Sequence, residues 1–181
     1  MRDYWHAVAM LRLDRPRGLT ELEACFAGGK AAEGLVGFRA GRLLATTWGY
    51  GLDGAFESMA RLWLPWRGKE FSRHAAEGVN LFTPGGRRAI RVTFPRYQGL
   101  ADGASGASAF RFETSIGPSA TDPGLSVLRL EYRIVGENPS IVRRLLDEIV
   151  SIDDGLCLGQ ALLSTGGRLG RVAWFSLETG D

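Results

Sequence analysis

The stretch from Leu125 to Leu177 constrains the fold of this chain more than any other part of the sequence. Between residues 126 and 134, apolar and polar side chains alternate, which is typical of a strand with one dry face. Asp153-Asp154-Gly155 predicts a tight turn between antiparallel strands, because glycine accepts the positive φ angle that this turn requires. Gly166-Gly167 predicts a second turn. Consecutive strands of this kind form a meander that closes into a barrel or a strongly curled sheet.

The first 30 residues predict a helical extension that precedes the strands. Residues 2–13 carry apolar side chains at helical spacing, and Thr20 with Glu23 forms a capping-box pattern for a second short helix. We therefore divide the chain into a helical N-terminal extension, residues 1–30, and one barrel domain, residues 31–181.

The remaining periodicities complete the expected barrel. Strands are expected within residues 37–47, 65–71, 78–82, 89–94 and 109–116, helices over 52–64 and 139–146, and a loop over 99–108. Asn138 and Pro139 are expected to start the second of these helices, because asparagine caps a helix and proline fits its first turn. The fold class is therefore mainly β (α+β). We expect an antiparallel barrel of about eight or nine strands, with short N-terminal helices and one or two short helices packed outside.

Composition narrows the classes of function. A net charge of +2 is too mild for a protein that depends on nucleic acid, so no nucleic-acid partner is expected. Cys25 and Cys157 lack the spacing of a zinc site or a disulfide framework. No apolar run has the length of a membrane span or a signal peptide, and we expect a soluble cytoplasmic protein. The richness in Ala, Gly and Arg suggests a bacterial source.

Three stretches together resemble a known family. GFRAG (37–41) stands where a G-x-W-x-G motif would stand, WRGKEF (66–71) followed by NLF (80–82) resembles its W-x-G-K-x-F…L-F stretch, and residues 147–163 with 172–178 resemble its C-terminal strand pair. The chain is similar in these pieces to the GXWXG-type, lipocalin-like group. This resemblance implies a calycin-like β-barrel and no established activity. Arg39 replaces the tryptophan of the motif, so closure of one barrel end by an aromatic ring is not implied.

No pattern predicts a cofactor or a metal. An axial histidine on a late strand is the usual haem ligand of small barrels, but the two histidines, His6 and His74, lie early in the chain. The cysteines have no neighbouring base in the sequence, and motifs for zinc, calcium or nucleotide phosphates are missing. We expect no cofactor, no metal and no catalytic residue that the sequence can identify.

An aromatic lining is the most suggestive functional feature. Alternating positions of neighbouring expected strands carry Phe110, Phe112, Leu130, Tyr132, Leu158, Gln160 and Trp174. If these side chains face inward, they either fill the barrel or surround one small guest. Lys69 and Arg129 are the candidate counter-charges for a carboxylated guest. The leading hypothesis is therefore a binding protein for a small, largely apolar molecule.

Two other hypotheses remain open. An isomerase or hydratase on the same barrel would need a titratable group with a perturbed pKa inside it, and Tyr132 and Asp53 are the candidates. A structural or interaction protein would have a filled core and would use the helix over residues 2–13 to bind a partner or form a homodimer.

Overall fold

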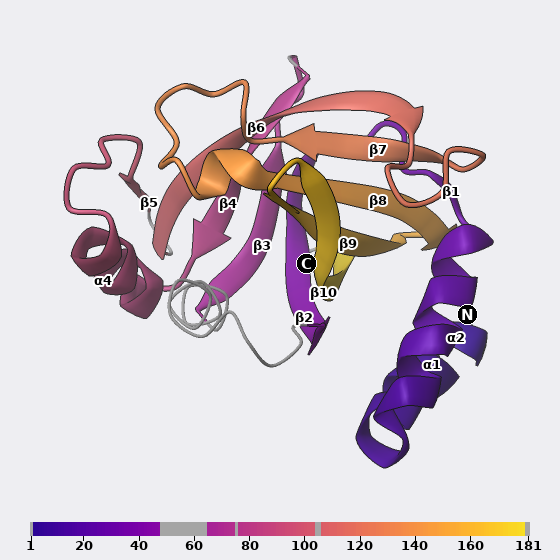
Figure 1. Ribbon diagram of the computed structural model, residues 1–181. Helices are drawn as coiled ribbons and strands as arrows, with labels where there is room; N and C mark the ends of the chain where they lie inside the picture. Colours follow the sequence, from indigo (N-terminus) through magenta and orange to yellow (C-terminus); the bar gives the residue numbers. More distant parts are fainter. Residues whose placement is uncertain (1, 48–64, 75, 104–105, 180–181) are drawn as a thin grey trace.

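The computed structural model describes residues 2–47, 65–74, 76–103 and 106–179 (Figure 1). The helices are α1 (Arg2–Leu13), α2 (Arg15–Ala27) and α4 (Pro84–Thr93), with a 3-10 helix η1 (Val142–Arg144). The strands are β1 (Lys30–Ala31), β2 (Gly37–Thr46), β3 (Trp66–Phe71), β4 (Glu77–Phe82), β5 (Ala101–Gly103), β6 (Gly106–Pro118), β7 (Ser126–Glu131), β8 (Leu145–Asp153), β9 (Leu156–Thr165) and β10 (Arg168–Thr179). The helix expected over residues 52–64 lies outside the described residues.

Eight of the described strands form a closed antiparallel barrel. β2, β3, β4, β6, β7, β8, β9 and β10 each pair with the next in this order, and β10 pairs with β2 to close the ring. The short strands β1 and β5 add to β8 and β6. The expected mainly β, antiparallel barrel is confirmed, and its up-and-down order follows from the turns seen in the sequence.

The connections between successive strands alternate between the two ends of the barrel, because neighbouring strands run antiparallel. One end carries the tight β8–β9 turn, with Gly155 at φ 72°. The opposite end carries the connections that hold α4 and η1 (Figure 1). Ile90 of α4 is fully buried in the interior cluster with Phe82 and Phe110, so α4 covers this end. We call it the α4 end.

Strand alternation separates an interior apolar cluster from an outer one. The interior cluster includes Phe71, Phe82, Phe110, Phe112, Leu130, Ile149, Phe175 and Leu177. The outer cluster joins Tyr4, Leu22 and Phe26 of the N-terminal helices to Val150, Leu158 and Trp174 on the barrel wall. Burial of each large side chain contributes roughly 1.5–3 kcal/mol, which holds the helices on the sheet.

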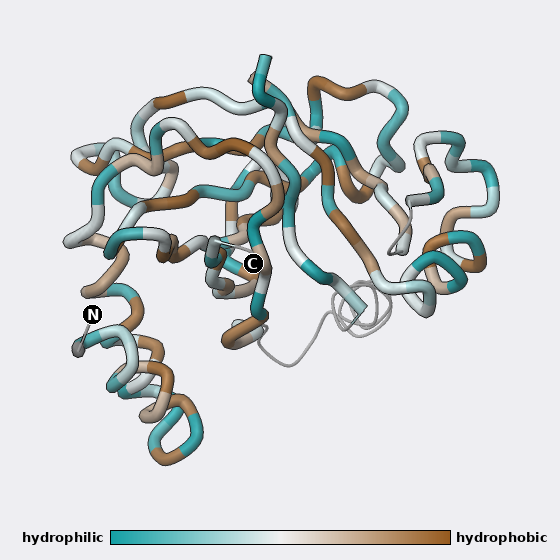
Figure 2. The backbone as a smooth tube through the Cα atoms, turned by 180° about the vertical axis from the view of Figure 1, so that it is seen from behind, coloured by the Kyte–Doolittle hydropathy of each residue, from teal (hydrophilic) through white to brown (hydrophobic). Residues whose placement is uncertain are grey.

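The helical pair α1–α2 is expected from the sequence and is present. Hydrophobic and hydrophilic residues follow one another around both helices (Figure 2), so one side of the pair can pack on the barrel. Gly18 lets the two helices approach closely, since a Cβ there would lie 2.5 Å from the Leu11 backbone nitrogen. α2 begins earlier than expected, at Arg15, because the Asp14 side chain caps it by accepting from the Arg17 amide.

The strand expected over residues 89–94 is wrong, because residues 89–93 belong to α4 and Phe94 is its C-cap. The alternation of apolar and basic residues is misleading here: Ile90 is buried but Val92 is 82% exposed. The helix starts where the Thr83 hydroxyl accepts from the Gly86 amide and Pro84 occupies the first turn. Local capping therefore outweighs the weak strand pattern.

The helix expected over residues 139–146 is also wrong. Only η1 is helical there, and Leu145 and Leu146 already pair with β9. The Asn138 side chain does not cap this segment. Its Oδ1 accepts from the Tyr97 hydroxyl at 3.5 Å, and its Nδ2 donates to the carbonyls of Arg111 and Tyr132. The loop expected over residues 99–108 is partly wrong as well, since β5 and the start of β6 lie within it.

Candidate functional site

A hydrogen-bonded polar cluster lies inside the barrel at Lys69. Its Nζ donates to Asn80 Oδ1, Tyr132 Oη and Asp147 Oδ2, each at 2.8 Å. Lys69 is 2% exposed and Asp147 3% exposed, so this is a buried ion pair. Lys69 lies on β3, Asn80 on β4 and Asp147 on β8, while Tyr132 directly follows β7. We call these four residues the Lys69 cluster.

The partners of Lys69 are also bound to one another. The Tyr132 hydroxyl donates to Asp147 Oδ2 at 2.8 Å and accepts from Asn80 Nδ2 at 3.1 Å. Asn80 Oδ1 also accepts from Trp66 Nε1 at 3.1 Å. Asn80 Nδ2 donates to the carbonyl of Phe110, whose φ of 57° is unusual for a bulky residue. The backbone at Phe110 therefore holds a strained conformation that points its carbonyl at the cluster.

Aromatic rings surround the ammonium group of Lys69. The ring centroids of Trp66, Phe112, Tyr132 and Phe175 lie 5.1–5.5 Å from Nζ. This distance suits cation–π attraction, which strengthens when water is excluded. The site thus combines one ion pair with an apolar wall.

Glycines in the barrel wall make room for three of these rings. A Cβ atom would lie 2.4 Å from the Trp66 ring at Gly41, 2.5 Å from the Phe112 ring at Gly78 and 2.2 Å from the Phe175 ring at Gly159. No real Cβ tolerates such distances. The rings therefore lie against bare backbone, which accounts for three of the many glycines in the strands.

Burial dominates the electrostatics of the cluster. It lowers the pKa of the Lys69 amine, and the attraction of Asp147 opposes this only in part. Burial, followed by the nearby Asp147 charge, raises the pKa of Tyr132 well above its ordinary value. The phenol therefore stays protonated as a hydrogen-bond donor, while the lysine gives up its proton more readily than one in water.

Stability at high pH is expected to reveal the raised pKa of Tyr132. Above pH 10 the unfolded phenol loses its proton and the folded one keeps it, so stability falls as pH rises, by up to about 1.4 kcal/mol per pH unit. The lowered pKa of Lys69 makes stability rise with pH below its ordinary pKa of 10.5, because the unfolded lysine binds a proton that the folded one has lost. The wild type and the Tyr132→Phe variant share this effect, so it cancels in their comparison. Urea unfolding of the wild type and Tyr132→Phe at several pH values from 9 to about 11.5 measures the difference. Parallel pH profiles would contradict the assignment.

Two buried polar atoms on the interior face of the barrel have no hydrogen-bond partner among the described residues. One is Asp147 Oδ1, on the carboxylate that binds Lys69. The other is Nε of Arg39. Arg39 lies on β2 directly opposite Lys69 of β3, so the two side chains share one face of the sheet. Its Nη1 donates to Thr179 Oγ1 at 2.7 Å. Buried polar atoms are normally satisfied, so an open acceptor and an open donor favour a bound molecule or water.

A second buried carboxylate, Glu148, lies on the outer face of β8. Its oxygens accept from the Ser119 hydroxyl, the Ala120 amide and Gln160 Nε2, each at 2.7 Å. Gln160 Oε1 accepts in turn from Arg171 Nε at 2.6 Å. Every oxygen of Glu148 is satisfied by the protein, so this group fastens the β6–β7 connection to the barrel wall.

The structure brings together five of the residues expected to line the interior. Lys69, Phe110, Phe112, Leu130 and Tyr132 all face inward and are buried. Lys69 and Tyr132 contact each other directly, which the sequence did not indicate.

The other four expected residues face outward, and their inward placement is wrong. Leu158 and Trp174 belong to the outer cluster under the N-terminal helices, and Gln160 binds Glu148. Arg129 lies on the outer face of β7, where it pairs with Glu131 at 3.5 Å. The sequence shows which residues of a strand share a face but not whether that face is interior, and the helices supply a second buried face.

Sequence reasoning missed Asn80, Arg39 and Asp147 as site residues. Asp147 directly follows the helix expected over residues 139–146, but it lies in a strand whose inward residues are Leu145, Asp147 and Ile149. The available signal was a carboxylate pair within the apolar run LLDEIV, where strand alternation forces one acid inward. Asp53, the other expected acid, lies outside the described residues.

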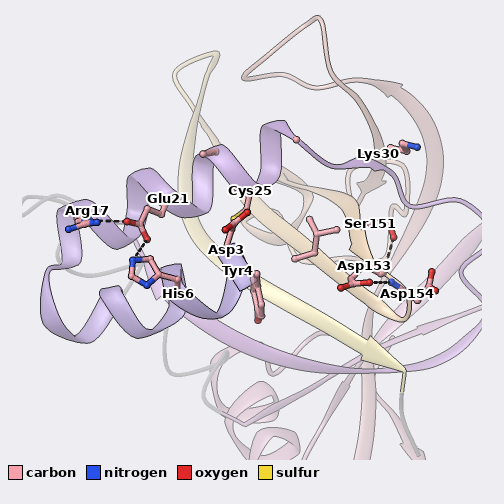
Figure 3. Close-up of a pocket in the computed structure, with 13 residues that line it drawn as sticks. Asp3, Tyr4, His6, Arg17, Glu21, Cys25, Lys30, Ser151, Asp153 and Asp154 are labelled. Carbon is pink, nitrogen blue, oxygen red and sulfur yellow. Dashed lines mark hydrogen bonds and ion pairs between the residues drawn. The ribbon is translucent and has the colours of Figure 1, made fainter. Parts of the chain in front are cut away.

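A separate groove lies outside the barrel, between the N-terminal helices and the β8–β9 turn (Figure 3). It has a volume of about 840 Å³ and is lined by polar residues such as Asp3, Lys30 and Asp154. Inside it Arg17 pairs with Glu21 at 2.9 Å. The groove shares no lining residue with the Lys69 cluster, and its charged groups lie at the surface.

The fold and the cluster together define the class: a closed, eight-stranded antiparallel barrel with a buried polar group inside it, as the described residues show. No protein-family model and no curated protein matches the sequence. A crystal structure of a protein from Thermomonospora curvata is similar in fold, with a TM-score of 0.55 and 10% identity over the whole of both chains. This likeness supports the fold alone. In the described part of the chain, no helix is both long and apolar enough to cross a membrane.

Proposed function

We propose that this barrel binds a small, largely apolar molecule in its interior, against the Lys69 cluster. The observation that carries the proposal is Asp147 Oδ1, a buried carboxylate oxygen without a partner among the described residues, on a cluster enclosed by aromatic rings. In a dry core a buried ion pair adds little stability, because apolar residues of similar volume replace it at little cost. A buried pair that also leaves one carboxylate oxygen open therefore supports a binding role.

The open groups suggest the chemistry of the guest. Asp147 Oδ1 can accept from a hydroxyl or amine group, and Arg39 Nε can donate to a carbonyl or carboxylate oxygen. Lys69 is poorly placed as the counter-charge for a carboxylated guest, because all three of its N–H groups already have acceptors. Arg129 lies on the outer face. Arg39 therefore replaces both expected residues in this role.

Native mass spectrometry of freshly purified protein tests the proposal directly. A co-purifying molecule, released by denaturation and identified, would support it, as would saturable binding of 1-hexanol or hexanoate added to the protein. The interior aromatic residues report on such binding, since Trp66 lies against Lys69 and its fluorescence should change. An experimental structure with an interior packed solid, and no binding of either probe, would reject the proposal.

Arg39→Gln is expected to weaken binding of hexanoate by roughly tenfold, because a charge-assisted hydrogen bond is lost. Binding of 1-hexanol should change much less. Arg129→Gln is the matched control, since it removes the same charge from the outer face. Isothermal titration of both variants with both probes measures the effect. Equal loss of hexanoate affinity in the two variants would contradict the role of Arg39.

An enzyme on the same barrel is the second candidate. The observation that favours it is a buried amine with a lowered pKa beside an acid and a phenol, since such groups are common in active sites.

We also propose a distant relationship to the GXWXG-type group. Its support is the contact between Trp66 and Lys69, both from the WRGKEF stretch, on the interior face of the barrel.

A further inference from the structure

Lysine is scarce in this chain, and its use inside the barrel is selective. The sequence has 20 arginines and 2 lysines, Lys30 and Lys69. Lys30 is exposed, whereas Lys69 is enclosed. Arginine is the usual choice for a buried ion pair, because it stays charged and binds a carboxylate through two parallel bonds. Lysine differs in that it can lose its proton and act as a nucleophile.

We propose that Lys69 captures an aldehyde or ketone as an imine, so that the guests of the barrel are apolar carbonyl compounds. This inference rests on the proposed interior binding and names the substrate class of that same site. The Lys69 cluster supplies the groups that imine formation needs: an amine, a proton acceptor 2.8 Å away at Asp147 and a phenol 2.8 Å away at Tyr132.

Each step of the reaction has a place for its proton. The Lys69 ammonium first gives a proton to Asp147 Oδ2, and the free amine attacks the carbonyl carbon, which forms the C–N bond. A proton then moves from the nitrogen to the carbonyl oxygen through the Tyr132 hydroxyl, which gives the carbinolamine. Asp147 then gives its proton to the hydroxyl group of the carbinolamine, the C–O bond breaks and water leaves. The product is a protonated imine beside a carboxylate, so the ion pair that the barrel already holds is preserved.

The cluster can lose two N–H donors without leaving its acceptors empty. A protonated imine keeps one N–H, which suits Asp147. Asn80 Oδ1 then still accepts from Trp66, and the Tyr132 hydroxyl still accepts from Asn80 and donates to Asp147. The partners of Lys69 are thus doubly bound, and conversion of the ammonium to an imine leaves no new unsatisfied group among them.

The surroundings favour the imine over its hydrolysis. The rings of Trp66, Phe112 and Phe175 close around Nζ and keep bulk water away from the C=N bond. The same burial lowers the pKa of Lys69, which increases the share of reactive amine at neutral pH.

Reductive labelling tests the inference on the intact protein. The protein is incubated with hexanal and sodium cyanoborohydride, and peptide mapping measures the hexyl group at Lys69, at Lys30 and at the α-amino group. We expect Lys69 to react at least about tenfold faster than exposed Lys30, because binding raises the effective concentration of the aldehyde. An excess of 1-hexanol should suppress labelling at Lys69 alone.

Variants provide the controls. Lys30→Arg should keep the labelling at the barrel site, and Lys69→Arg should abolish it while Lys30 still reacts. If Lys69→Arg does not fold, the wild-type pattern with and without 1-hexanol decides alone. If exposed Lys30 reacts faster than buried Lys69 while the protein still binds 1-hexanol, imine formation at Lys69 is rejected and the proposed binding stands. Absence of labelling at Lys69 together with absence of 1-hexanol binding would overturn both.

Discussion

Replacing Lys69 by methionine is expected to lower the free energy of unfolding by about 3–5 kcal/mol. The side chain stays unbranched and is shorter by one atom, so packing changes little, but Asp147 is left 3% exposed without its counter-ion. The hydroxyl of Tyr132 and the amide of Asn80 also lose a donor. A carboxylate buried without a partner is among the most costly defects that a single substitution can create.

The double variant Lys69→Met with Asp147→Leu separates this defect from the value of the pair. We expect it to regain most of the lost stability, because two apolar side chains replace a desolvated ion pair at little cost. Lys30→Met is the matched control and should change stability by less than about 0.5 kcal/mol, since Lys30 is exposed. Urea unfolding followed by fluorescence measures all three variants. A single variant as stable as the wild type would show that the ion pair is not closed in solution.

Replacing Glu148 by alanine is expected to cost about 3 kcal/mol or more. Glu148 is 0% exposed, and its removal takes the acceptor from the Ala120 amide. The Ser119 hydroxyl and Gln160 Nε2 each lose one charge-assisted bond and keep only Thr121 Oγ1. Each buried donor left unsatisfied costs roughly 1–3 kcal/mol.

The effect should also be local. The β6–β7 connection is held to the barrel wall through Glu148, so hydrogen exchange of the Ala120 amide should quicken more than exchange in the Lys69 cluster. Glu33→Ala, at an exposed position, is the control for loss of charge. Uniform exchange across the barrel, or no loss of stability, would contradict the proposed fastening role.

The fold was largely predictable from the sequence, because it depends on local patterns. The Asp153-Asp154-Gly155 turn and the alternation in its flanking strands predict the β8–β9 hairpin, which the structure confirms. The errors at residues 89–94 and 139–146 arose where short apolar runs fit both helix and strand. In the first case a helix cap decided, and in the second the pairing of β8 with β9.

The candidate site was only half predictable, because it depends on which face of a strand turns inward. Phe112 and Tyr132 were placed correctly by parity, but Leu158 and Trp174 share the same alternation and face the helices instead. A sheet covered on both faces carries apolar residues on both, so parity alone does not identify the interior. Asp147 shows the signal that was available: an acid within a continuous apolar run must have buried partners, either an opposite charge or hydrogen-bond donors.

The adjacent acids of β8 affect the register in which this strand pairs with its neighbours. Asp147 binds Lys69 inside, and Glu148 binds Gln160 outside, so one strand carries a different polar anchor on each face. A register shift of β8 by one residue would turn its inward side chains outward and its outward side chains inward. Both acids would then be buried in apolar surroundings without their partners. Purely apolar strands tolerate such slippage more easily, because leucine and isoleucine fit either face. The two carboxylates therefore select the correct pairing register of β8, even where they add little to the stability of the correctly paired barrel.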